Sequence, residues 1–377
     1  MSSPKILISG AGIAGLSLAR LLLKAGIDFV IIEKRANDHS SGSGIALPFN
    51  AMIALRTLGL AEQVLGAAHQ VHLVSYANKE GKTIASASLD QAPLNRDKFV
   101  AMKRAELHDI LAKDIAELVH YQTVIESMEQ VSDGVEIKCS NAALNAKYDL
   151  VVAAEGIHSP LRKQCYANES TVLDHNIPTW RFVVDYPNHG LEPLYMFART
   201  ELFMAYPIGP DSLYCYGHIY DETDKYSQGN AYQHLTDVFG DFGGEVPAIL
   251  KRAAEVEILS GRLQSVAKPY YSSGRIVFVG DAGNACSPLL QQGAASAFED
   301  VICLAEQLQQ HSIEQAIRSY QQTRSPRVEW IVKSSDGPIK MMKKMRNPIG
   351  VFLRNVMIKK KGPLNAVGWR YLAADKV

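Results

Sequence analysis

Three glycines near the start of the chain, Gly10, Gly12 and Gly15, have the spacing of a loop that binds a dinucleotide. Gly10 would permit a tight turn, Gly12 would let the backbone approach a pyrophosphate, and Gly15 would let a helix pack closely on a strand. The N–H groups of a helix that starts at such a loop can bind the pyrophosphate. The chemistry indicated first is therefore the binding of a nucleotide cofactor, and Ala14 in the same turn is a further candidate contact.

The elements that must position these glycines can also be predicted. The apolar run 5–9 predicts a buried strand, 16–24 predicts a helix, and 29–32 predicts a second strand. Glu33 ends the second strand about 20 residues after the glycines, where a carboxylate can accept both ribose hydroxyls. Lys34 follows it as another candidate contact. A carboxylate here suits an unphosphorylated ribose, which favours FAD or NAD over NADP.

A second stretch that could do chemistry lies three-quarters of the way along the chain. It follows the apolar run 275–279, a predicted strand, and leads into a helix predicted over 294–308. Asp281 stands at the end of the strand, Pro288 lies in the connecting loop, and Gly293 lies where the helix begins. The free N–H groups and the positive dipole end of such a helix favour an electron-rich occupant. We expect that occupant to be a flavin ring.

Four motifs, taken together, resemble those of a known family. In chain order they are Gly10-x-Gly12-x-x-Gly15 with Glu33, Arg104-x-x-Leu107-x-x-x-Leu111, Glu155-Gly156-Ile-His-Ser159 with Arg162, and Gly280-Asp281 with Pro288 and Gly293. The set resembles the group A flavoprotein aromatic hydroxylases, the p-hydroxybenzoate hydroxylase-like FAD monooxygenases. The resemblance covers roughly residues 4–330, and the combination is far more specific than any one motif.

The resemblance implies an α/β fold. A Rossmann-type FAD-binding domain would be interleaved with an antiparallel-sheet substrate domain and followed by C-terminal helices. The implied segments are 1–170 and 269–330 for the two parts of the FAD-binding domain, 171–268 for the substrate-binding sheet, and 331–377 for a C-terminal helical tail. The Ser- and Gly-rich stretch 37–44 predicts a loop.

The implied activity is that of an FAD-dependent monooxygenase. It would use NAD(P)H and O2 to hydroxylate an aromatic or polyketide-like small molecule through a flavin C4a-hydroperoxide. The flavin performs the organic chemistry, and the protein binds, orients and desolvates the reactants. No residue is identified as a general base. The alternatives are a flavin-dependent dehydrogenase, reductase or halogenase of related fold, and a non-catalytic module that keeps a flavin as a structural plug. The halogenase motif Trp-x-Trp-x-Ile-Pro does not occur in the sequence.

The resemblance also implies roles for individual residues. Gly10, Gly12 and Gly15 would hold the FAD pyrophosphate, Glu33 the adenosine ribose, and Arg104 the phosphate or ribityl region. Val124, in a strand predicted over 119–124 and antiparallel to a strand over 134–139, would offer its backbone to adenine. Asp281 would hydrogen-bond the ribityl chain, Pro288 would lie beside the isoalloxazine, and Gly293 and Ala294 would face its pyrimidine edge.

Four positions depart from the family pattern. Glu155 stands where aspartate is usual, Asn284 where histidine is usual, Gln291 where glycine is usual, and Ala295 where asparagine is usual. A side chain at 291 would narrow the flavin site or stiffen its loop. Altered flavin mobility and simple divergence both remain open interpretations.

Alternating, aromatic-rich runs predict a sheet in the second segment. The predicted strands are 180–185, 194–197, 201–206 and 212–218. Their aromatic side chains would form a wall for an aromatic substrate, or else the core of the sheet. Arg181, Tyr206 and His218 are the candidate polar contacts to the substrate.

Composition excludes some classes of function. The formal net charge of the 377 residues is zero, which gives no general attraction to nucleic acid. The five cysteines form no C-x-x-C pair, so we expect a reducing, cytoplasmic location. We expect no membrane span and no metal site, because we find neither a long uncharged apolar run nor a metal-ligand pattern.

The stretch from Ile339 to Lys361 is basic and amphipathic and contains no acidic residue. Such a stretch can lie weakly on an anionic membrane surface. Alternatively it covers the substrate entrance, packs on a second subunit, or forms a helix with a solvated basic face.

Overall fold

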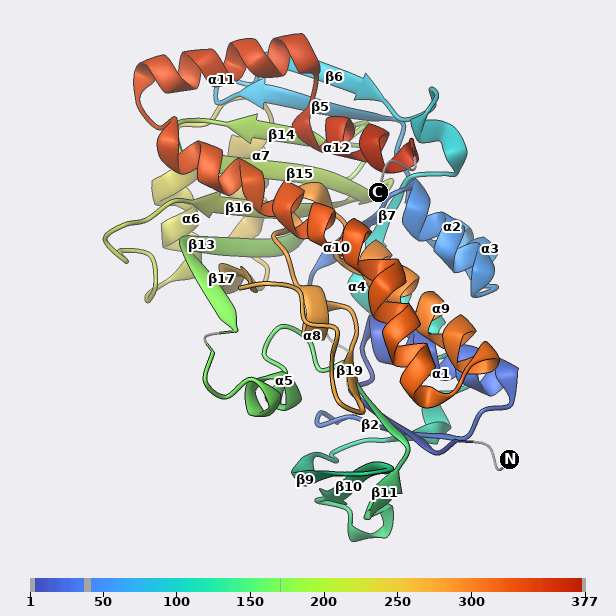
Figure 1. Ribbon diagram of the computed structural model, residues 1–377. Coiled ribbons are helices and arrows are strands. Elements are labelled where there is room, and N and C mark those ends of the chain that lie inside the picture. Colours follow the sequence, from blue (N-terminus) through green and yellow to red (C-terminus); the bar gives the residue numbers. More distant parts are fainter. Residues whose placement is uncertain (1–3, 37–41, 170, 375–377) are drawn as a thin grey trace.

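The computed structural model in Figure 1 describes residues 4–36, 42–169 and 171–374. Most of the loop predicted over 37–44 lies outside the described residues. The architecture is α/β, as predicted: a mainly parallel sheet forms one end of the molecule and a larger, mainly antiparallel sheet forms the other. A long helix, α10 (Ile313–Lys344), runs across both.

The mainly parallel sheet contains the first predicted motif. Its apolar strands are buried almost throughout, as is typical of a parallel sheet covered on both faces. The central strand β1 pairs in parallel with strands on either side, so that Ile6 lies between Phe29 and Leu150. The sheet order is β18-β19-β12-β1-β2-β8, with β1 Ile6–Ser9, β2 Phe29–Ile32, β8 Val119–His120, β12 Leu150–Ala153, β18 Ser272–Ser273 and β19 Ile276–Phe278.

Two helices that are far apart in sequence pack side by side on this sheet. Helix α1 (Ile13–Ala25) follows the glycine loop and begins three residues earlier than the predicted helix over 16–24. Helix α9 (Gly293–Gln310) contains the helix predicted over 294–308. Their buried side chains, including Leu16 and Phe298, belong to one core cluster, and Figure 1 shows the two helices next to each other.

The strand predicted over 119–124 is wrong in length and in partner. Only Val119 and His120 are extended, and they pair in parallel with β2 rather than with the strand at 134–139. Gln122 has a positive φ of 52°, so the chain turns there and the strand cannot continue. The antiparallel partner of β10 (Gly134–Cys139) is instead β9 (Ile125–Val131), in a small sheet completed by β11 (Ala146–Tyr148).

The second large sheet contains all four strands predicted for the substrate segment. It also includes β5 and β6 from the first segment, so it extends beyond residues 171–268. Local periodicity could not show this pairing, because β14 joins β5 across more than a hundred residues. The order is β17-β13-β16-β15-β14-β5-β6, with β5 Leu73–Asn78, β6 Thr83–Ser88, β13 Val172–Asp185, β14 Leu194–Phe197, β15 Glu201–Gly209, β16 Ser212–Ile219 and β17 Leu259–Val266.

Helices cover both faces of this sheet. Helices α6 (Ala231–Phe239) and α7 (Val246–Ala253) pack against one face, where Trp180 and Phe182 are buried. The C-terminal helices cover the other face: α10, α11 (Pro348–Lys361) and α12 (Leu364–Ala373). The segment boundary predicted at 330/331 therefore falls inside the continuous helix α10.

Shorter elements complete the chain. A three-stranded sheet, β3-β7-β4, leads directly into α4, which begins at Arg104 after the last residue of β7. These elements are β3 Gly44–Leu47, β4 His69–Gln70, β7 Val100–Lys103, α2 Phe49–Thr57, α3 Ala61–Ala67, α4 Arg104–Ala112, α5 Pro160–Cys165, α8 Asp281–Asn284, and the 3-10 turns η1 Leu94–Arg96, η2 Ala116–Leu118, η3 Ala142–Leu144 and η4 Pro288–Leu290.

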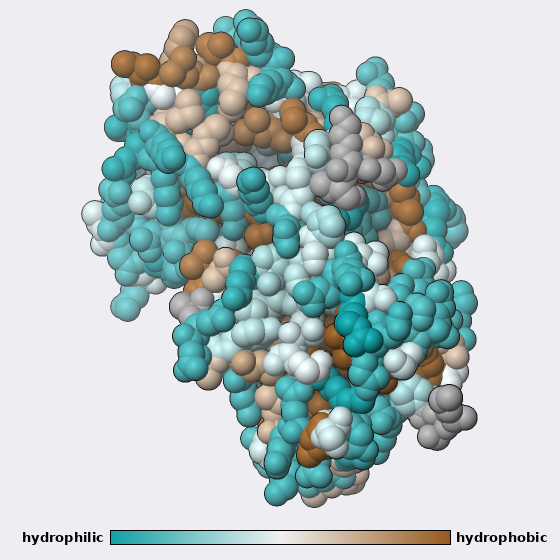
Figure 2. All heavy atoms as spheres, viewed as in Figure 1, coloured by the Kyte–Doolittle hydropathy of each residue, from teal (hydrophilic) through white to brown (hydrophobic). Residues whose placement is uncertain are grey.

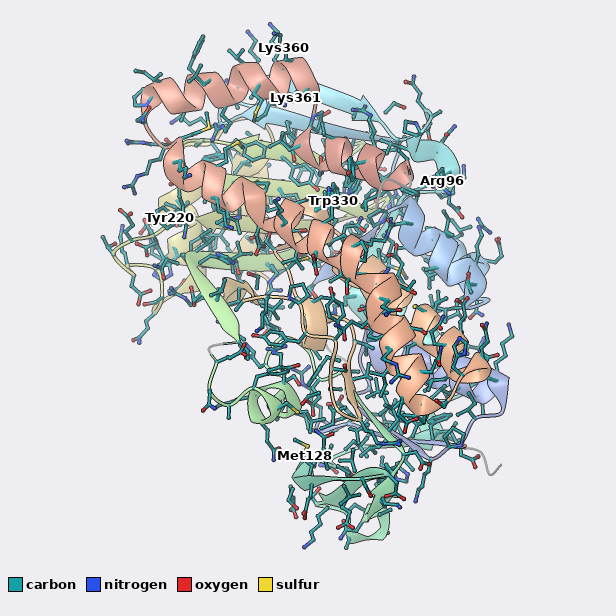
Figure 3. The ribbon with its side chains drawn as sticks, viewed as in Figure 1. Arg96, Met128, Tyr220, Trp330, Lys360 and Lys361 are labelled. Atoms are coloured by element: carbon teal, nitrogen blue, oxygen red, sulfur yellow. The ribbon has the colours of Figure 1, made fainter. Side chains whose placement is uncertain are left out.

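The last helix is fixed to the body of the protein at several points. The Trp330 ring of α10 stacks on Tyr371 of α12, with ring centroids 4.6 Å apart. Arg96 of η1 donates to the carbonyl oxygen of Ala373 at 2.9 Å. Figure 3 labels Trp330 and Arg96 on the two sides of this helix. The C-terminal helices are therefore part of the fold and not an appended tail.

Candidate active site

The glycine loop before α1 needs glycine at two positions for steric reasons. Gly10 has a φ of 107°, and a Cβ atom there would lie 2.5 Å from the carbonyl oxygen of Ala154. A Cβ atom on Gly15 would lie 1.8 Å from the carbonyl oxygen of Gly10. Gly12 differs, because a Cβ atom there would meet no protein atom within 4 Å. The space in front of Gly12 is therefore available to a ligand.

The N-terminus of α1 faces that space without a cap. Its N-cap residue is Gly12, no side chain caps the first turn, and no acidic residue lies in it. The uncapped N–H groups and the helix dipole make this end a binding site for a phosphate. Ala14 lies in this turn, where the absence of a large side chain keeps the backbone accessible.

Glu33 holds the glycine loop against the end of β2. Its Oε2 accepts from the N–H of Ala11 at 2.9 Å, and its Oε1 accepts from the N–H of Arg35 at 2.9 Å. Each carboxylate oxygen can accept more than one hydrogen bond, so the half-exposed side chain retains capacity for ribose hydroxyls. Lys34 next to it is exposed.

The second predicted loop lies directly against the first. Gly280 has a φ of 55°, and a Cβ atom there would lie 3.2 Å from Ala14 Cβ and 3.1 Å from Ala297 Cβ. Ala14 belongs to α1 and Ala297 to α9, so Gly280 lies in the contact between the two helices. Only small residues at all three positions permit this approach. The fold thereby brings together two motifs that are some 270 residues apart in sequence.

Asp281 lies beside the N-terminus of α9 and within the electrostatic influence of two arginines. A Cβ atom on Gly293 would lie 3.8 Å from Asp281 Oδ1, so the carboxylate is next to the N-terminus of α9. The surrounding protein desolvates the carboxylate and raises its pKa, and the charges of Arg104 and Arg162 oppose this rise. The residue nevertheless remains exposed to solvent. Asp281, Gly293 and Arg104, predicted from separate motifs, are thus neighbours.

Arg162 connects the Glu155 motif to the Asp281 motif. Its guanidinium group is buried, which lowers its pKa, and it donates to the carbonyl oxygens of Ala282, at 2.5 Å, and Ile157. Glu155 accepts from the hydroxyls of Ser9 at 2.7 Å and Ser159 at 2.5 Å. Glutamate at 155 therefore joins the end of β1 to the start of α5, which gives this departure a structural role.

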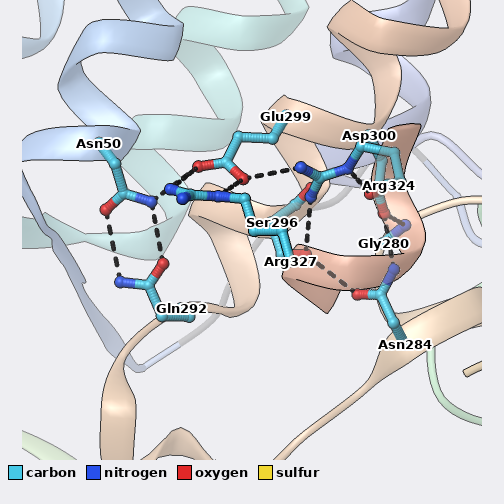
Figure 4. A network of polar contacts seen from close by, with 9 residues as sticks. All are labelled: Asn50, Gly280, Asn284, Gln292, Ser296, Glu299, Asp300, Arg324 and Arg327. Atoms are coloured by element: carbon cyan, nitrogen blue, oxygen red, sulfur yellow. Dashed lines mark hydrogen bonds and ion pairs between the residues drawn. The ribbon is translucent and has the colours of Figure 1, made fainter. Parts of the chain in front are cut away.

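A buried polar network lies behind the second loop, and Figure 4 shows it from close by. Asp300 is fully buried and accepts from Gly280 N–H at 2.9 Å, from Asn284 Nδ2 at 2.7 Å and from Arg324 Nε at 2.7 Å. Three donors compensate the buried carboxylate. Asn284, in place of the usual histidine, is therefore one of the groups that hold the loop.

Glu299 extends this network to α2 and α10. Its carboxylate accepts from Arg324 at 2.9 Å, from Arg327 at 2.7 Å and from Asn50 Nδ2 at 2.9 Å. Asn50 also donates to the side chain of Gln292, the fully buried N-cap residue of α9. Burial lowers the pKa of Arg324, but Asp300 and Glu299 raise it well above its ordinary value. The sequence analysis missed this network; the two adjacent acids on the buried face of α9 were the available signal.

The N-terminus of α9 is uncapped, like that of α1. The side chain of Gln292 is bonded to Asn50 and caps nothing, and no acidic residue lies in the first turn. Gly293 and Ala294 are therefore the first residues of a helix whose N–H groups can face a ligand. Ala295 is fully buried in the core. Pro288, at the start of η4, is exposed on the same loop.

Gln291 adopts the left-handed conformation that the usual glycine would favour, with a φ of 55°. Its Nε2 donates to the hydroxyl of Tyr195 on the large sheet at 2.7 Å. Its Oε1 and the hydroxyl of Tyr206 are buried and have no hydrogen-bond partner among the described residues. The longer side chain at 291 thus ties the loop to the substrate-side sheet and leaves two polar atoms for a ligand or water.

A cavity of about 70 Å³, partly open to the surroundings, lies between this sheet, the η4 turn and the C-terminal helices. Leu289 and Leu290 of η4 line it, so the cavity borders the predicted flavin loop. Most of its lining is apolar or aromatic; the lining residues are Tyr76, Tyr195, Phe197, Glu201, Leu202, His218, Leu289, Leu290, Ser334, Pro338, Ile339, Met341, Met342, Arg354, Ile358, Leu364 and Asn365.

Polar groups in the cavity are few, and Glu201 and Arg354 are its charged ones. His218 is buried, which lowers its pKa to about 3, and its Nδ1 lies 3.0 Å from the hydroxyl of Tyr216. The histidine is therefore neutral at physiological pH. Asn365, at the start of α12, is 2% exposed, and its Nδ2 has no partner among the described residues. The sequence analysis did not find Asn365, because it belongs to the segment predicted as a tail.

Other predicted residues lie away from this cavity. Arg181 and Tyr206 are on the same sheet but do not line it, and His218 does. The N–H and C=O groups of Val124 are both bonded to Ser140, at 3.1 and 3.0 Å. Adenine could bond these two backbone groups only if their bonds to Ser140 were broken. The role of Val124 therefore stays a prediction.

Within residues 4–36, 42–169 and 171–374, no group of three or more side chains that could hold a metal ion lies together. No helix in the same ranges is both long and apolar enough to cross a membrane.

Comparison with known proteins gives consistent matches. The profile of the family described as FAD binding domain matches residues 4–335. The 2-heptyl-3-hydroxy-4(1H)-quinolone synthase of Pseudomonas aeruginosa is 28% identical over 364 residues, covering 94% of this chain and 93% of that relative. The putative FAD-dependent monooxygenase YetM of Bacillus subtilis is 27% identical, covering 85% and 89%. Klebsiella pneumoniae HpxO, solved with FAD and uric acid, has a similar fold, with a TM-score of 0.85, 20% identity and coverage of 98% and 97%.

Proposed function

Because the chain belongs to the FAD binding domain family, the group A flavoprotein monooxygenases, we propose that it hydroxylates a neutral aromatic small molecule with NAD(P)H and O2. One observation carries this proposal: α1 and α9, both with uncapped N-termini, come into contact at Gly280, and a largely apolar cavity borders the same loop. The first arrangement suits a long anionic cofactor, and the second suits a flat apolar substrate at one end of it.

The cofactor of this family is FAD, and the residues present fit it. We assign the pyrophosphate to the loop of Gly10, Gly12, Ala14 and Gly15, since among its three glycines Gly12 is the one that faces open space. Glu33 and Lys34 would hold the adenosine end. Arg104 and Asp281 would bind the middle of the cofactor, and Pro288, Gly293 and Ala294 would border the flavin ring.

When bound, FAD accepts a hydride from NAD(P)H and activates O2 for transfer of one oxygen atom. The chain would contribute position and electrostatics. The N-terminus of α9 would stabilise negative charge that develops next to Gly293. The network of Asp300, Glu299 and Arg324 would fix that N-terminus against β19 and keep its geometry during turnover. The apolar cavity would exclude water from the reacting atoms.

The cavity indicates the chemistry of the substrate. His218 is neutral, and the two charged side chains of the mainly aromatic and aliphatic lining, Glu201 and Arg354, have opposite signs. The cavity therefore favours a substrate without net charge. The free Nδ2 donor of Asn365 would pair with a carbonyl or phenol oxygen. The relatives named after a quinolone and the structure with uric acid are consistent with flat, neutral or weakly polar heterocycles.

We also propose that the chain divides into FAD-binding, substrate-sheet and C-terminal segments as predicted, except that β5 and β6 belong to the substrate sheet.

The direct test uses the purified protein. Its visible spectrum should show bound FAD, and a screen of aromatic compounds should find one that accelerates NAD(P)H oxidation, consumes O2 and yields an oxygenated product. Substrate-dependent reduction without O2 consumption or product would indicate a dehydrogenase or reductase instead. A flavin that no combination of NAD(P)H and aromatic compound reduces would indicate a non-catalytic flavin-binding module.

A further inference from the structure

Helix α11 presents an apolar face that no other part of the described chain covers. Ile349, Phe352, Leu353 and Val356 are exposed by 73, 66, 51 and 44%, and they follow the i, i+3, i+4, i+7 spacing of one helical face. We call these four residues the outer face of α11. Figure 2 shows apolar side chains gathered along this helix at the upper left of the molecule. Large aliphatic and aromatic side chains this exposed, and this close together, usually mark an interaction site.

The opposite face of the same helix borders the cavity. Arg354 and Ile358 are buried and line it. Arg354 donates to the carbonyl oxygen of Ala198 at 2.7 Å, which holds the inner face on the large sheet. Helix α11 is therefore part of the wall between the cavity and the surroundings.

The charge around the outer face is predominantly positive, although Arg346 at its edge is paired with Glu222 at 2.8 Å. Lys359, Lys360 and Lys361 are exposed at the C-terminal end of α11, and Figure 3 labels the last two there. Lys340, Lys344 and Arg346 are exposed at the preceding end of α10 and in the turn after it. The sequence contains no aspartate or glutamate from residue 337 to residue 374. The chain as a whole has zero net charge, so this concentration of positive charge is local.

We propose that α11 docks on an anionic lipid surface, with its outer face in the boundary between headgroups and acyl chains. An apolar face rimmed with lysines matches such a surface in both hydrophobicity and charge. A second copy of this chain would bring the same positive charges together, which disfavours self-association through this face. The same docking would place the cavity next to the bilayer. If the proposed function holds, an apolar aromatic substrate could enter the cavity from there.

The test measures sedimentation of the full-length FAD-bound protein with vesicles. Binding is expected to vesicles of phosphatidylcholine mixed with phosphatidylglycerol, to be much weaker with phosphatidylcholine alone, and to fall as salt is raised. Replacing Lys359, Lys360 and Lys361 together by Gln should weaken binding on the order of a hundredfold, since each lysine near an anionic surface contributes roughly a factor of five. Leu353→Ser should weaken it about tenfold through lost apolar burial.

Matched controls separate this surface from general effects. Leu23 is as exposed as Leu353, at 52%, but lies on α1, so Leu23→Ser should bind vesicles like the wild type. Replacing the exposed Lys24, Lys113 and Lys138 by Gln removes the same charge elsewhere and should also leave binding unchanged. Equal loss in control and α11 variants, or no binding by the wild type, would overturn the proposal. The proposal would also be overturned if the protein forms a dimer that Leu353→Ser dissociates and that added vesicles leave intact. None of these readouts depends on turnover, so the proposed enzymatic function can fail or hold independently.

Discussion

The indole N–H of Trp369 donates to the carbonyl oxygen of Leu290 at 2.9 Å, which joins the last helix of the chain to the loop that borders the proposed flavin site. The helix approaches so closely that a Cβ atom on Gly368 would lie 2.3 Å from Leu290 Cδ1. The C-terminal helices therefore contact the loop of the proposed flavin site as well as the cavity proposed for the substrate. They line the cavity with Arg354 and Asn365 and fix the η4 turn through Trp369.

Trp369→Phe should destabilise the holoprotein by about 1–3 kcal/mol, because it leaves the carbonyl of Leu290 without its donor in a buried place. Denaturant unfolding measures this, and FAD should dissociate faster from the variant. Trp330→Phe is the control, since phenylalanine can keep the stacking on Tyr371. Equal stability of the two variants would contradict the role given to the indole.

Gly12→Ala should weaken FAD binding and leave the apoprotein as stable as the wild type. A Cβ atom at 12 meets no protein atom within 4 Å, so its clash would be with the cofactor alone. Overpacking of this kind costs about 1–3 kcal/mol, or about ten- to a hundredfold in affinity.

Gly15→Ala is the comparison for this variant. Its Cβ would lie 1.8 Å from the Gly10 carbonyl oxygen, so it should lose both stability and FAD. Thermal unfolding of the apoproteins, together with FAD titration, distinguishes the two. If Gly12→Ala retained normal FAD affinity, the pyrophosphate would not lie where we place it.

Asp281→Ala should weaken FAD binding about ten- to a hundredfold, the usual range for a lost hydrogen bond to a charged group. Asp281 lies among Arg104, Arg162 and the N-terminus of α9, so its removal takes a carboxylate out of a cationic region. FAD affinity is measured by flavin fluorescence. Asp133→Ala, which removes an exposed carboxylate paired with Lys147, should leave it unchanged. Unaltered FAD retention in Asp281→Ala would count against the ribityl contact.

Asn365→Leu should raise the KM for the aromatic substrate about tenfold and change kcat little. Asn365 Nδ2 has no partner among the described residues, so its loss would be felt by the substrate. The variant also loses the bond that Asn365 Oδ1 accepts from the N–H of Ala366 at 2.9 Å, which affects the start of α12. The FAD content of the variant should remain that of the wild type, which serves as the internal control. A lower kcat with an unchanged KM would mean that Asn365 acts on the reaction step and does not hold the substrate.

The buried His218 should make stability depend on pH. The unfolded chain takes up a proton on this residue near pH 6.5, but the folded protein, where burial lowers the pKa to about 3, does not. The free energy of unfolding should therefore lose about 1.4 kcal/mol per pH unit from this residue as pH falls from 6.5 towards 3. Above pH 6.5 its contribution is complete.

Denaturant unfolding of wild type and His218→Gln between pH 4 and 7, each value compared at the same pH, measures this slope. The difference in free energy of unfolding between wild type and His218→Gln should shrink as pH decreases. His158→Gln is the control, because His158 is exposed in the folded protein. A constant difference between wild type and His218→Gln would show that the folded protein protonates this residue normally.

The sequence by itself determined the elements that rest on neighbouring residues. The strand, glycine turn, helix, strand and Glu33 at the start are close together in the chain, and steric limits at Gly10 and Gly15 fix their form. The strand over 194–197 and the helix that begins at Gly293 likewise follow from local periodicity and from a glycine at the helix start. Short-range geometry leaves few alternatives at these places.

Only the tertiary structure decided the contacts between distant segments. Val119 and His120 pair with β2 and so extend the parallel sheet. The strand ends there because the backbone turns at Gln122. Asp300 and Arg324 meet beneath Gly280, and Trp369 reaches Leu290, across separations that no local pattern records. Packing of the whole chain selects these partners, since a buried charge or donor takes whichever group the fold places beside it.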